Sequence, residues 1–403
     1  MSQLGYMEKL LDGVEVEWTV LGDENFVEVA NSGRKPVKSS LRVPGNTPYY
    51  GANNIQDYVD GHTHDGEYVL IAEDGSASLD RYSIQYTTGR FWANNHVHVV
   101  RGKLGLNTRY LYHYLSTVNF IPFLTGGGRA KLTKGNMIEI PIPIPCPANQ
   151  KKSLKVQAEI VRILDTFTEL TAELTAELTA RQQQYAYYRD ELLTFEEGEV
   201  EWKTLGEIGH IVTGRTPKSS NKSAWGNDVD FVTPSDIKNG MRNITFPSRR
   251  LSAEGAASMS KVLIPSGSLL VTCIGADMGK TVINANDCIP NQQINAITLT
   301  DDSVQVSYLF HVLTAMREAL LRQGELGGGT MPLINKSDFS KIVVPIPSHE
   351  EQNRIATILD KFDALTNSIT EGLPCEIELR QKQYEYYRDL LLSFPKPEVV
   401  AHD

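Results

Sequence analysis

Apolar side chains recur at spacings of three and four residues along a stretch without glycine or proline, residues 151–195. Ile160, Leu164, Phe167 and Leu178 would share one face of an α-helix there. Such a helix would be about 65 Å long, well beyond the usual length in globular domains. The pattern therefore predicts a long helix that packs against another helix.

A second stretch, from about residue 350 to 394, has the same spacing and could supply that partner. Gly372-Leu373-Pro374 should interrupt it, because proline lacks a backbone donor and clashes with the preceding turn. We expect the two helices to pack as an antiparallel pair in the manner of a coiled coil.

The two larger blocks of the chain alternate short β-prone runs with turn residues. These runs lie at residues 67–72, 96–100, 268–274 and 294–299, bounded by Gly, Asn, Asp and Pro. One helical stretch is expected in each block, at residues 109–117 and 307–321. Proline-rich strands, residues 141–145 and 345–347, end the blocks because proline cannot continue a helix.

An internal repeat covers nearly the whole chain, with a period of about 185–200 residues that is too long for a solenoid. The start of the chain also resembles the end of the first helical segment, as in a circularly arranged two-fold object. The repeated motifs are Glu15-Val16-Glu17-Trp18 and Glu199-Val200-Glu201-Trp202, Tyr110-Leu111 and Tyr308-Leu309, Ile163-Leu164-Asp165-x-Phe167 and Ile358-Leu359-Asp360-x-Phe362, and Gln184-Tyr185-x-Tyr187-Tyr188-Arg189-Asp190 and Gln383-Tyr384-x-Tyr386-Tyr387-Arg388-Asp389.

The predicted fold class is α/β in the mixed α+β sense. Two globular domains are separated by a pair of long antiparallel helices in pseudo-two-fold relation. The expected boundaries are 1–147 for the first domain, with an N-terminal segment that completes the circular repeat, 148–197 for the central helix, 198–347 for the second domain, and 348–403 for the C-terminal helix and tail.

Composition is that of an ordinary globular protein, 41% hydrophobic and 22% charged. No apolar stretch approaches the roughly 20 residues needed to span a bilayer, and the start lacks the features of a signal peptide. Four scattered cysteines without a Cys-x-x-Cys pair argue against a disulfide framework and a structural zinc site. We therefore expect a cytoplasmic protein that does not associate with membranes.

The net charge of −10 is unusual for a protein that binds DNA, but its distribution matters more than its total. The acidic excess lies in the first residues and in the two helical segments, whereas both large blocks are near neutral. Phosphate binding needs local basic surface, so the charge pattern permits nucleic acid as a ligand.

The first helix contains a tandem repeat, Thr171-Ala172-Glu173-Leu174 followed by Thr175-Ala176-Glu177-Leu178. A single copy is explained by an ordinary amphipathic helix with Leu buried and Glu in solvent. In tandem, whole four-residue units also change the length of a helix in fixed steps.

These features together resemble the specificity subunits of type I restriction-modification systems, and the Thr-Ala-Glu-Leu tandem is similar to that of the type IC subfamily. The resemblance rests on the two blocks, the proline-rich exits and the paired Ile-Leu-Asp-x-Phe and Gln-Tyr-x-Tyr-Tyr-Arg-Asp motifs, and it covers essentially the full chain. It implies that each block is a target recognition domain reading one half of a split, asymmetric site in double-stranded DNA. It also implies helices that set the spacer.

The resemblance further implies docking of two methyltransferase subunits and the presence of restriction subunits, which act as motor and nuclease. S-adenosylmethionine would serve the methyltransferase partner, and ATP with Mg the restriction partner, with no cofactor in this chain. We expect subunit docking by Tyr185, Tyr187, Tyr188, Arg189, Tyr384, Tyr386, Tyr387 and Arg388. Alternatively, these aromatic residues merely cap the helix pair.

Three patterns that could indicate catalysis or cofactor binding are weak. The sequence from Gly275 to Thr281 resembles a P-loop, but three residues separate its glycines where four are required, so a glycine-rich hairpin is expected. Asn46-Thr47-Pro48-Tyr49 resembles the Asn-Pro-Pro-Tyr of amino-methyltransferases without its first proline, and a turn is expected there. The pairs His62-x-His64 and His96-x-His98 would each share one face of a strand, but the second aligns with Gln293-x-Asn295 in the other block, so local packing or polar surface is favoured over a metal site. We predict no catalytic, cofactor or metal site.

Both blocks carry basic and amide side chains suited to DNA, since Arg and Lys neutralise phosphates and Arg, Asn and Gln read base edges. For any single basic residue a solvated surface charge is the plainer interpretation. The candidates are Arg34, Lys35, Lys38, Arg42, Arg90, Asn94, Arg129, Lys131, Lys134, Arg215, Lys218, Lys222, Arg249, Arg250, Lys261, Lys280 and Lys336.

Two other classes of protein remain as alternatives. A stand-alone DNA methyltransferase should carry a glycine-rich cofactor loop and an intact Asn-Pro-Pro-Tyr motif, and both are missing. A structural scaffold that joins protein subunits through its helices is harder to exclude, because helix-mediated assembly is common to both interpretations.

Overall fold

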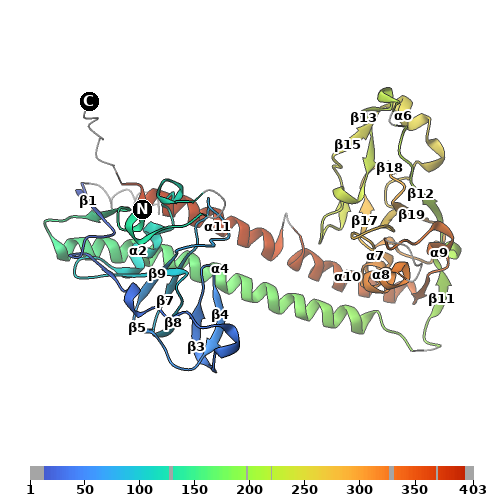
Figure 1. Ribbon diagram of the computed structural model, residues 1–403. Coiled ribbons are helices and arrows are strands. Elements are labelled where there is room, and N and C mark those ends of the chain that lie inside the picture. Colours follow the sequence, from blue (N-terminus) through green and yellow to red (C-terminus); the bar gives the residue numbers. More distant parts are fainter. Residues whose placement is uncertain are drawn as a thin grey trace. The chain divides into compact units, whose positions relative to one another are not determined.

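The computed structural model describes residues 13–126, 130–196, 198–218, 220–325, 331–368 and 371–394 (Figure 1). These residues form two compact units. Unit 1 lies within residues 1–171 and 380–403, and unit 2 within residues 172–379. Each unit therefore contains a sheet-rich domain together with parts of the long helices.

The first long helix, α4 (Gln150–Leu192), is continuous, as the sequence predicts. The side chain of Asn149 caps its start by accepting a hydrogen bond from the backbone N–H of Lys152. By chain position, α4 begins in unit 1 and ends in unit 2. Along the Thr-Ala-Glu-Leu tandem the leucines are half-buried and the alanines and glutamates are exposed, which matches the predicted amphipathic pattern.

The second long segment is two helices, α10 (His349–Thr366) and α11 (Gly372–Leu392), so the predicted interruption is confirmed. Gly372 has a φ of +75°, and a Cβ there would lie 2.3 Å from the carbonyl oxygen of Ala364. Only glycine fits this position without strain. Helix α10 lies in unit 2, whereas α11 begins in unit 2 and ends in unit 1.

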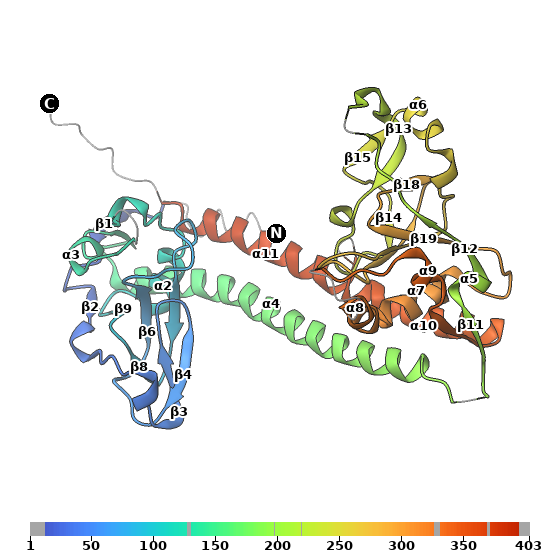
Figure 2. The ribbon, with the colours of Figure 1, turned by 45° about the vertical axis from the view of Figure 1, so that its right-hand side comes forward.

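The described residues of unit 1 form three sheets and two short α-helices besides the long ones (Figures 1 and 2). In strand order, the sheets are β1 (Val16–Val20) with β10 (Pro141–Pro145); β2 (Val27–Val29), β9 (Val97–Gly102), β6 (Tyr68–Ala72) and β7 (Ile84–Thr87); and β4 (Ile55–Val59), β3 (Pro44–Tyr50), β8 (Arg90–Ala93) and β5 (His64–Asp65). The helices are α2 (Thr108–Leu115) and α3 (Lys134–Met137). Strand β3 pairs antiparallel with β4 and parallel with β8.

Unit 2 repeats this plan. In strand order, its sheets are β11 (Glu201–Thr204) with β20 (Val343–Ile346); β12 (Gly209–Thr213), β19 (Ile294–Leu299), β16 (Leu269–Thr272), β17 (Thr281–Asn284) and β14 (Asn243–Ile244); and β15 (Arg249–Leu251), β13 (Trp225–Val232) and β18 (Cys288–Pro290). Its shorter helices are α5 (Leu205–Ile208), α6 (Ala253–Ala257), α7 (Val306–Ala315), α8 (Arg317–Glu325) and α9 (Lys336–Ser340). Strand β13 pairs antiparallel with β15 and parallel with β18, as β3 does with β4 and β8. The mixed α/β class is confirmed.

Two local expectations were wrong. Residues 46–49 lie on strand β3, where Tyr49 is buried and pairs with Asp57 of β4 and Trp92 of β8, so this segment is not a turn. The single helix expected at residues 307–321 is divided into α7 and α8 at Met316. For residues 46–49, pairing with strands distant in sequence overrides the local sequence pattern.

The core of each unit joins the start of one long helix to the end of the other. In unit 1, Ile160 and Leu164 of α4 are buried in one cluster with Leu391 and Leu392 of α11. The ring of Phe167 stacks on that of Tyr387, with ring centres 5.2 Å apart. The Ile-Leu-Asp-x-Phe motif of α4 is therefore packed against the Tyr-x-Tyr-Tyr motif of α11.

Unit 2 contains the reciprocal contact. Tyr185 and Tyr188, at the end of α4, stack on Phe362 of α10 with ring centres 6.1 and 5.7 Å apart. Tyr185 is buried in the same cluster as Leu359. In both units, an Ile-Leu-Asp-x-Phe motif thus packs against a Tyr-x-Tyr-Tyr motif. The two motifs that meet come from different halves of the sequence.

A buried histidine fixes each long helix to its domain. In unit 1, Nε2 of His113 donates to the Asp165 carboxylate at 2.8 Å, and Arg109 binds the same oxygen at 2.8 Å. Burial raises the pKa of Asp165, but these hydrogen bonds outweigh burial and hold the pKa below its usual value. The Asp of the Ile-Leu-Asp motif is therefore a charged anchor for α2.

In unit 2, Nε2 of His311 donates to Asp360 at 2.7 Å, but the arginine comes from another part of the chain. Ser307 stands one residue before Tyr308, as Arg109 stands before Tyr110, and Arg242 binds both Asp360 and Ser307. Both units therefore contain an Asp bound by a His and an Arg. The Arg lies on α2 in unit 1, but in unit 2 it is Arg242, which lies outside the corresponding helix α7.

Candidate nucleic-acid interface

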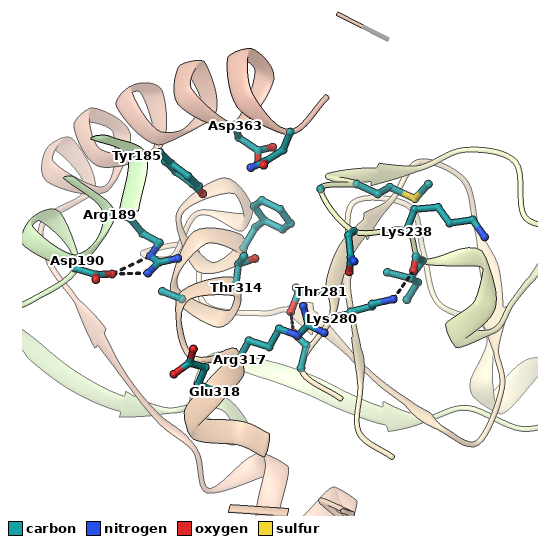
Figure 3. A pocket seen from close by; sticks show the side chains of 18 residues that line it. Tyr185, Arg189, Asp190, Lys238, Lys280, Thr281, Thr314, Arg317, Glu318 and Asp363 are labelled. Carbon is teal, nitrogen blue, oxygen red and sulfur yellow. Dashed lines mark hydrogen bonds and ion pairs between the residues drawn. The ribbon is translucent and has the colours of Figure 1, made fainter. Parts of the chain in front are cut away.

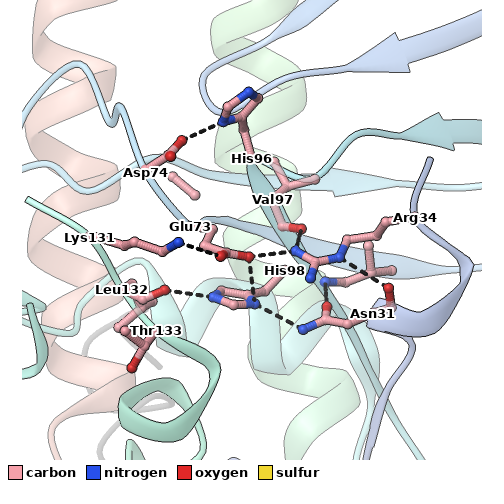
Figure 4. Close-up of polar contacts among 12 residues, drawn as sticks. Asn31, Arg34, Glu73, Asp74, His96, Val97, His98, Lys131, Leu132 and Thr133 are labelled. Carbon is pink, nitrogen blue, oxygen red and sulfur yellow. Dashed lines mark hydrogen bonds and ion pairs between the residues drawn. The ribbon is translucent and has the colours of Figure 1, made fainter. Parts of the chain in front are cut away.

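Two basic candidates of the first domain, Arg34 and Lys131, are bound to the same carboxylate of the fold. Arg34 donates to the Glu73 carboxylate at 2.6 Å and to the carbonyl oxygen of Val97 at 2.8 Å, with only 18% of its side chain exposed (Figure 4). Lys131 binds the other Glu73 oxygen at 3.1 Å. Burial raises the pKa of Glu73, but the hydrogen bonds from Arg34 and Lys131 outweigh it and lower the pKa overall. Arg34 therefore stabilises the fold.

The same network defines the state of His98. Its Nε2 lies 2.8 Å from the carbonyl oxygen of Leu132, which can only accept, so Nε2 carries the proton (Figure 4). Its Nδ1 lies 2.9 Å from the amide nitrogen of Asn31 and accepts from it. Burial lowers the pKa of His98 below its usual value, which favours this neutral form.

Other candidates of the first domain differ in exposure and in their contacts. Arg42 lies 4.0 Å from the ring centre of Tyr49 and binds Asp57 at 3.2 Å, with 15% of its side chain exposed. Asn94 is buried, and its side chain accepts from the N–H of His96. Arg90 forms only an exposed 3.5 Å contact with Asp65, which is a weak interaction in solvent. Lys35, Lys38 and Lys134 are exposed, and Arg129 lies outside the described residues.

In the second domain two of the candidates are also in ion pairs. Arg250 binds the buried carboxylate of Asp230 at 2.8 Å, and Lys280 binds Asp277 at 2.6 Å. Arg249 instead lies 3.4 Å from the ring centre of Trp225. The remaining candidates are exposed, namely Arg215, Lys218, Lys222, Lys261 and Lys336.

Sequence reasoning missed several residues of these surfaces. Leu41 and Val43 are 70% and 63% exposed beside Arg42, and Phe246 is 92% exposed near Arg249. Trp225 was missed as the platform for Arg249. The one sequence signal for Leu41 and Val43 is that they are apolar residues within a polar, basic loop. Their exposure could not be predicted, because it depends on the fold.

The patterns that resemble catalytic motifs are parts of ordinary structure. The residues from Gly275 to Thr281 join β16 and β17, which pair antiparallel, so the expected glycine-rich hairpin is confirmed. No group of three or more His, Cys, Asp or Glu side chains within the described ranges is arranged to hold a metal ion. Likewise, no described helix is long and apolar enough to cross a membrane.

Comparison with known proteins decides the family. The family described as type I restriction modification DNA specificity domain matches residues 15–181 and 197–379. A putative type I restriction enzyme specificity subunit of Haemophilus influenzae is 48% identical over 401 residues, which cover 96% of this chain and 98% of that protein. The EcoR124I/EcoR124II specificity subunit of Escherichia coli is 38% identical over 418 residues and is matched over 100% of both chains. The chain belongs to the type I restriction-modification specificity subunits.

A solved structure agrees with this fold. The type I S subunit from M. genitalium superposes with a TM-score of 0.63 at 13% identity, over 96% of this chain and 98% of that one. Members of the family are DNA specificity subunits without catalytic activity. This specificity subunit is accordingly non-catalytic.

The Tyr-x-Tyr-Tyr-Arg-Asp motifs of the specificity subunit divide into buried and exposed positions. The first and third tyrosines contact the core of the units, although Tyr188 is still 38% exposed, and the hydroxyl of Tyr384 lies 3.3 Å from Nδ1 of His113. The middle tyrosines point outward, with Tyr187 65% exposed and Tyr386 56% exposed. Arg189 and Arg388 each bind the Asp that follows them at 2.7 Å.

Each Arg-Asp pair also lines a cavity. In unit 2, Arg189 and Asp190 border a polar cavity of about 640 Å³ together with Tyr185 and Arg317 (Figure 3). In unit 1, Arg388 and Asp389 border a cavity of about 860 Å³. In each unit an exposed tyrosine therefore precedes, by two residues, an Arg-Asp pair that borders a cavity.

We expect Arg34→Ala to destabilise the specificity subunit by roughly 1–3 kcal/mol, since it removes the shortest of the basic contacts to the largely buried Glu73 and leaves that carboxylate with Lys131 and the more distant His98. Because the folded pKa of Glu73 is lowered, this penalty should be full above about pH 5 and shrink as pH falls through that pKa. Chemical denaturation at several pH values measures it. Lys35→Ala, at an exposed neighbour, should change stability by less than about 0.5 kcal/mol. Equal stability of both variants would contradict the structural role of Arg34.

Proposed function

We propose that this specificity subunit reads a bipartite, asymmetric target in double-stranded DNA, with one half-site for each recognition domain. The observation that carries the proposal is that both domains pair their strands in the same pattern but carry different side chains on them. Strand β3 and its two neighbours correspond to β13 and its neighbours. Arg42 is held by Tyr49 and Asp57 on the first plan, whereas Arg249 lies on Trp225 on the second. Different contact groups on one scaffold favour two different half-sites.

Exchange of residues 19–147 for the equivalent block of a relative should change the first half-site and leave the second intact. Sequencing that detects methylated bases, in a host expressing the complete system, reports both halves at once. A change in both half-sites would contradict independent reading. Unchanged sites, together with no DNA binding by the assembled subunits, would favour the scaffold interpretation instead.

The proposal includes a spacer set by the helices. One Thr-Ala-Glu-Leu unit adds about 6 Å and about 40° beyond a full helical turn. One base pair of B-DNA rotates by about 34–36°, so the rotation of one unit matches one base pair. The translation exceeds one base pair, and the opposing helix, which keeps its length, would absorb part of it.

Deletion of Thr175, Ala176, Glu177 and Leu178 should therefore shorten the non-specific spacer by one base pair with both half-sites unchanged. The same mapping of methylated sites measures this. Deletion of two residues instead of four should abolish binding, because it rotates the rest of the helix by about 200°. A spacer of unchanged length after the four-residue deletion would show that α4 does not measure distance.

The proposed partners are two methyltransferase subunits, which would use S-adenosylmethionine, and restriction subunits, which would use ATP with Mg. Two features support two methyltransferase sites. The exposed Tyr187 and Tyr386 occupy equivalent positions, and each lies near an Arg-Asp pair beside a cavity. Exposed tyrosines are frequent anchors of protein interfaces.

We expect two methyltransferase subunits per chain by native mass spectrometry. Tyr187→Ala should lower this number to one at concentrations near the dissociation constant, and the double variant with Tyr386→Ala should lower it to none. Loss of such an anchor weakens binding by roughly 2 kcal/mol, or about 30-fold. Gln182→Ala, on the exposed surface of the same helix, serves as the control. One methyltransferase per wild-type chain would contradict the two-site proposal.

A further inference from the structure

Arg249 differs from the other arginines in the described part of the second domain. Arg242, Arg250 and Arg322 form ion pairs, and Arg317 donates to a backbone carbonyl. The guanidinium of Arg249 lies on the ring of Trp225 and makes no hydrogen bond or ion pair with a described residue. Arg215 is also exposed without an ion pair to a described residue, but no aromatic ring holds it. Arg249 alone in this set combines a fixed position with donor groups that remain available.

The platform under Arg249 is itself anchored in the core. The ring of Trp225 packs edge-on against Phe231 with ring centres 5.1 Å apart, and Phe231 is 1% exposed. Phe231 and Arg249 are direct partners in the register of β13 and β15. The guanidinium therefore rests on a ring that is held in place by a buried ring, and this lowers the entropy lost when Arg249 binds a ligand.

The neighbouring Arg250 shows how specific this arrangement is. Its side chain binds Asp230, whose own side chain is 6% exposed, and the carbonyl oxygen of Asp228. Both arginines are exposed, but Arg250 is bound to Asp230 and Asp228, whereas the guanidinium of Arg249 has no such partner among the described residues. The sheet that carries both lies at the end of unit 2 away from α10 (Figures 1 and 2).

The first domain uses the same cation–aromatic contact internally. Arg42 lies over Tyr49, but Asp57 and the carbonyl oxygen of Val37 take its donors. An arginine therefore lies over a ring of the corresponding strands β3 and β13 in both domains, with its donors partly taken in the first domain and unpaired with described residues in the second. An open, planar guanidinium with two parallel donors matches the O6 and N7 acceptors of guanine in the major groove, the commonest specific contact between arginine and a base.

We propose that Arg249 reads a guanine in the half-site of the second domain through a bidentate contact, and that Trp225 positions it. This inference rests on the proposed function, in which that domain reads one half-site. Lysine at this position keeps the charge but has no fork, so it cannot reproduce the contact. The competing role for Arg249 is a contact with a DNA phosphate. Lysine also binds phosphate, as a point charge, so Arg249→Lys would largely keep such a contact.

The test maps methylated sites in a host that expresses the complete system with Arg249→Lys or Arg249→Ala. We expect preference for guanine at one position of one half-site to fall roughly tenfold to a hundredfold in both variants, with the other half-site and the spacer unchanged. Trp225→Ala should weaken discrimination at the same position, and Trp225→Phe should largely restore it. Arg322→Lys, at an exposed arginine of α8, controls for the substitution, and thermal unfolding confirms that each variant is folded.

Two results would overturn the inference. One is an unchanged target for both Arg249 variants. The other is a uniform loss of methylation at all sites, with a salt dependence of DNA binding reduced by about one charge, which indicates a phosphate contact. Exchange of residues 201–347 in the same host separates this inference from the function beneath it. If that exchange changes a half-site while the Arg249 variants do not, only the role of Arg249 fails; if it changes neither half-site, the proposed function fails as well.

Discussion

The structure depends on the packing of two tyrosines at the end of each long helix against the Ile-Leu-Asp-x-Phe segment of the other. Tyr387 meets Phe167 in unit 1, and Tyr185 and Tyr188 meet Phe362 in unit 2. Neither domain buries its own helical segment without the helix end that the other half of the sequence provides. Each core is therefore completed by a helical segment from the other half of the sequence.

This constraint explains which parts of the repeat are kept and which vary. The residues that join helix to domain have the same contacts twice, as His113 with Asp165 and His311 with Asp360 show. Gln157 and Gln352 are both fully buried. Each accepts a hydrogen bond from the backbone N–H of the residue before a domain helix, namely Asn107 before α2 and Gln305 before α7. Away from these joints the two domains differ in side chains. A shared frame with divergent surfaces suits a protein that presents two different reading surfaces.

The sequence alone predicted the elements that depend on local chemistry and repetition. The uninterrupted α4, the break before Gly372 and the proline-rich strands follow from backbone rules, and the repeat identified the equivalent motifs. It could not predict which cations are paired with carboxylates of the fold. Arg34 and Glu73 are 39 residues apart, and Arg250 and Asp230 are 20 apart, so their pairing depends on strand register. The strand at residues 46–49 was missed for the same reason, since its partners are distant in sequence.

The central claim is that the end of each long helical segment completes the core of the unit in which the other segment begins. A double-mutant cycle tests this claim directly. Alanine substitutions of Phe167 and Tyr387, singly and together, should give a coupling of about 0.5–1.5 kcal/mol in the free energy of unfolding. The cycle for Phe167 and Tyr188 should be additive within about 0.5 kcal/mol, although Tyr188 lies on the same helix as Phe167. Coupling of Phe167 to Tyr188 with none to Tyr387 would contradict the reciprocal packing.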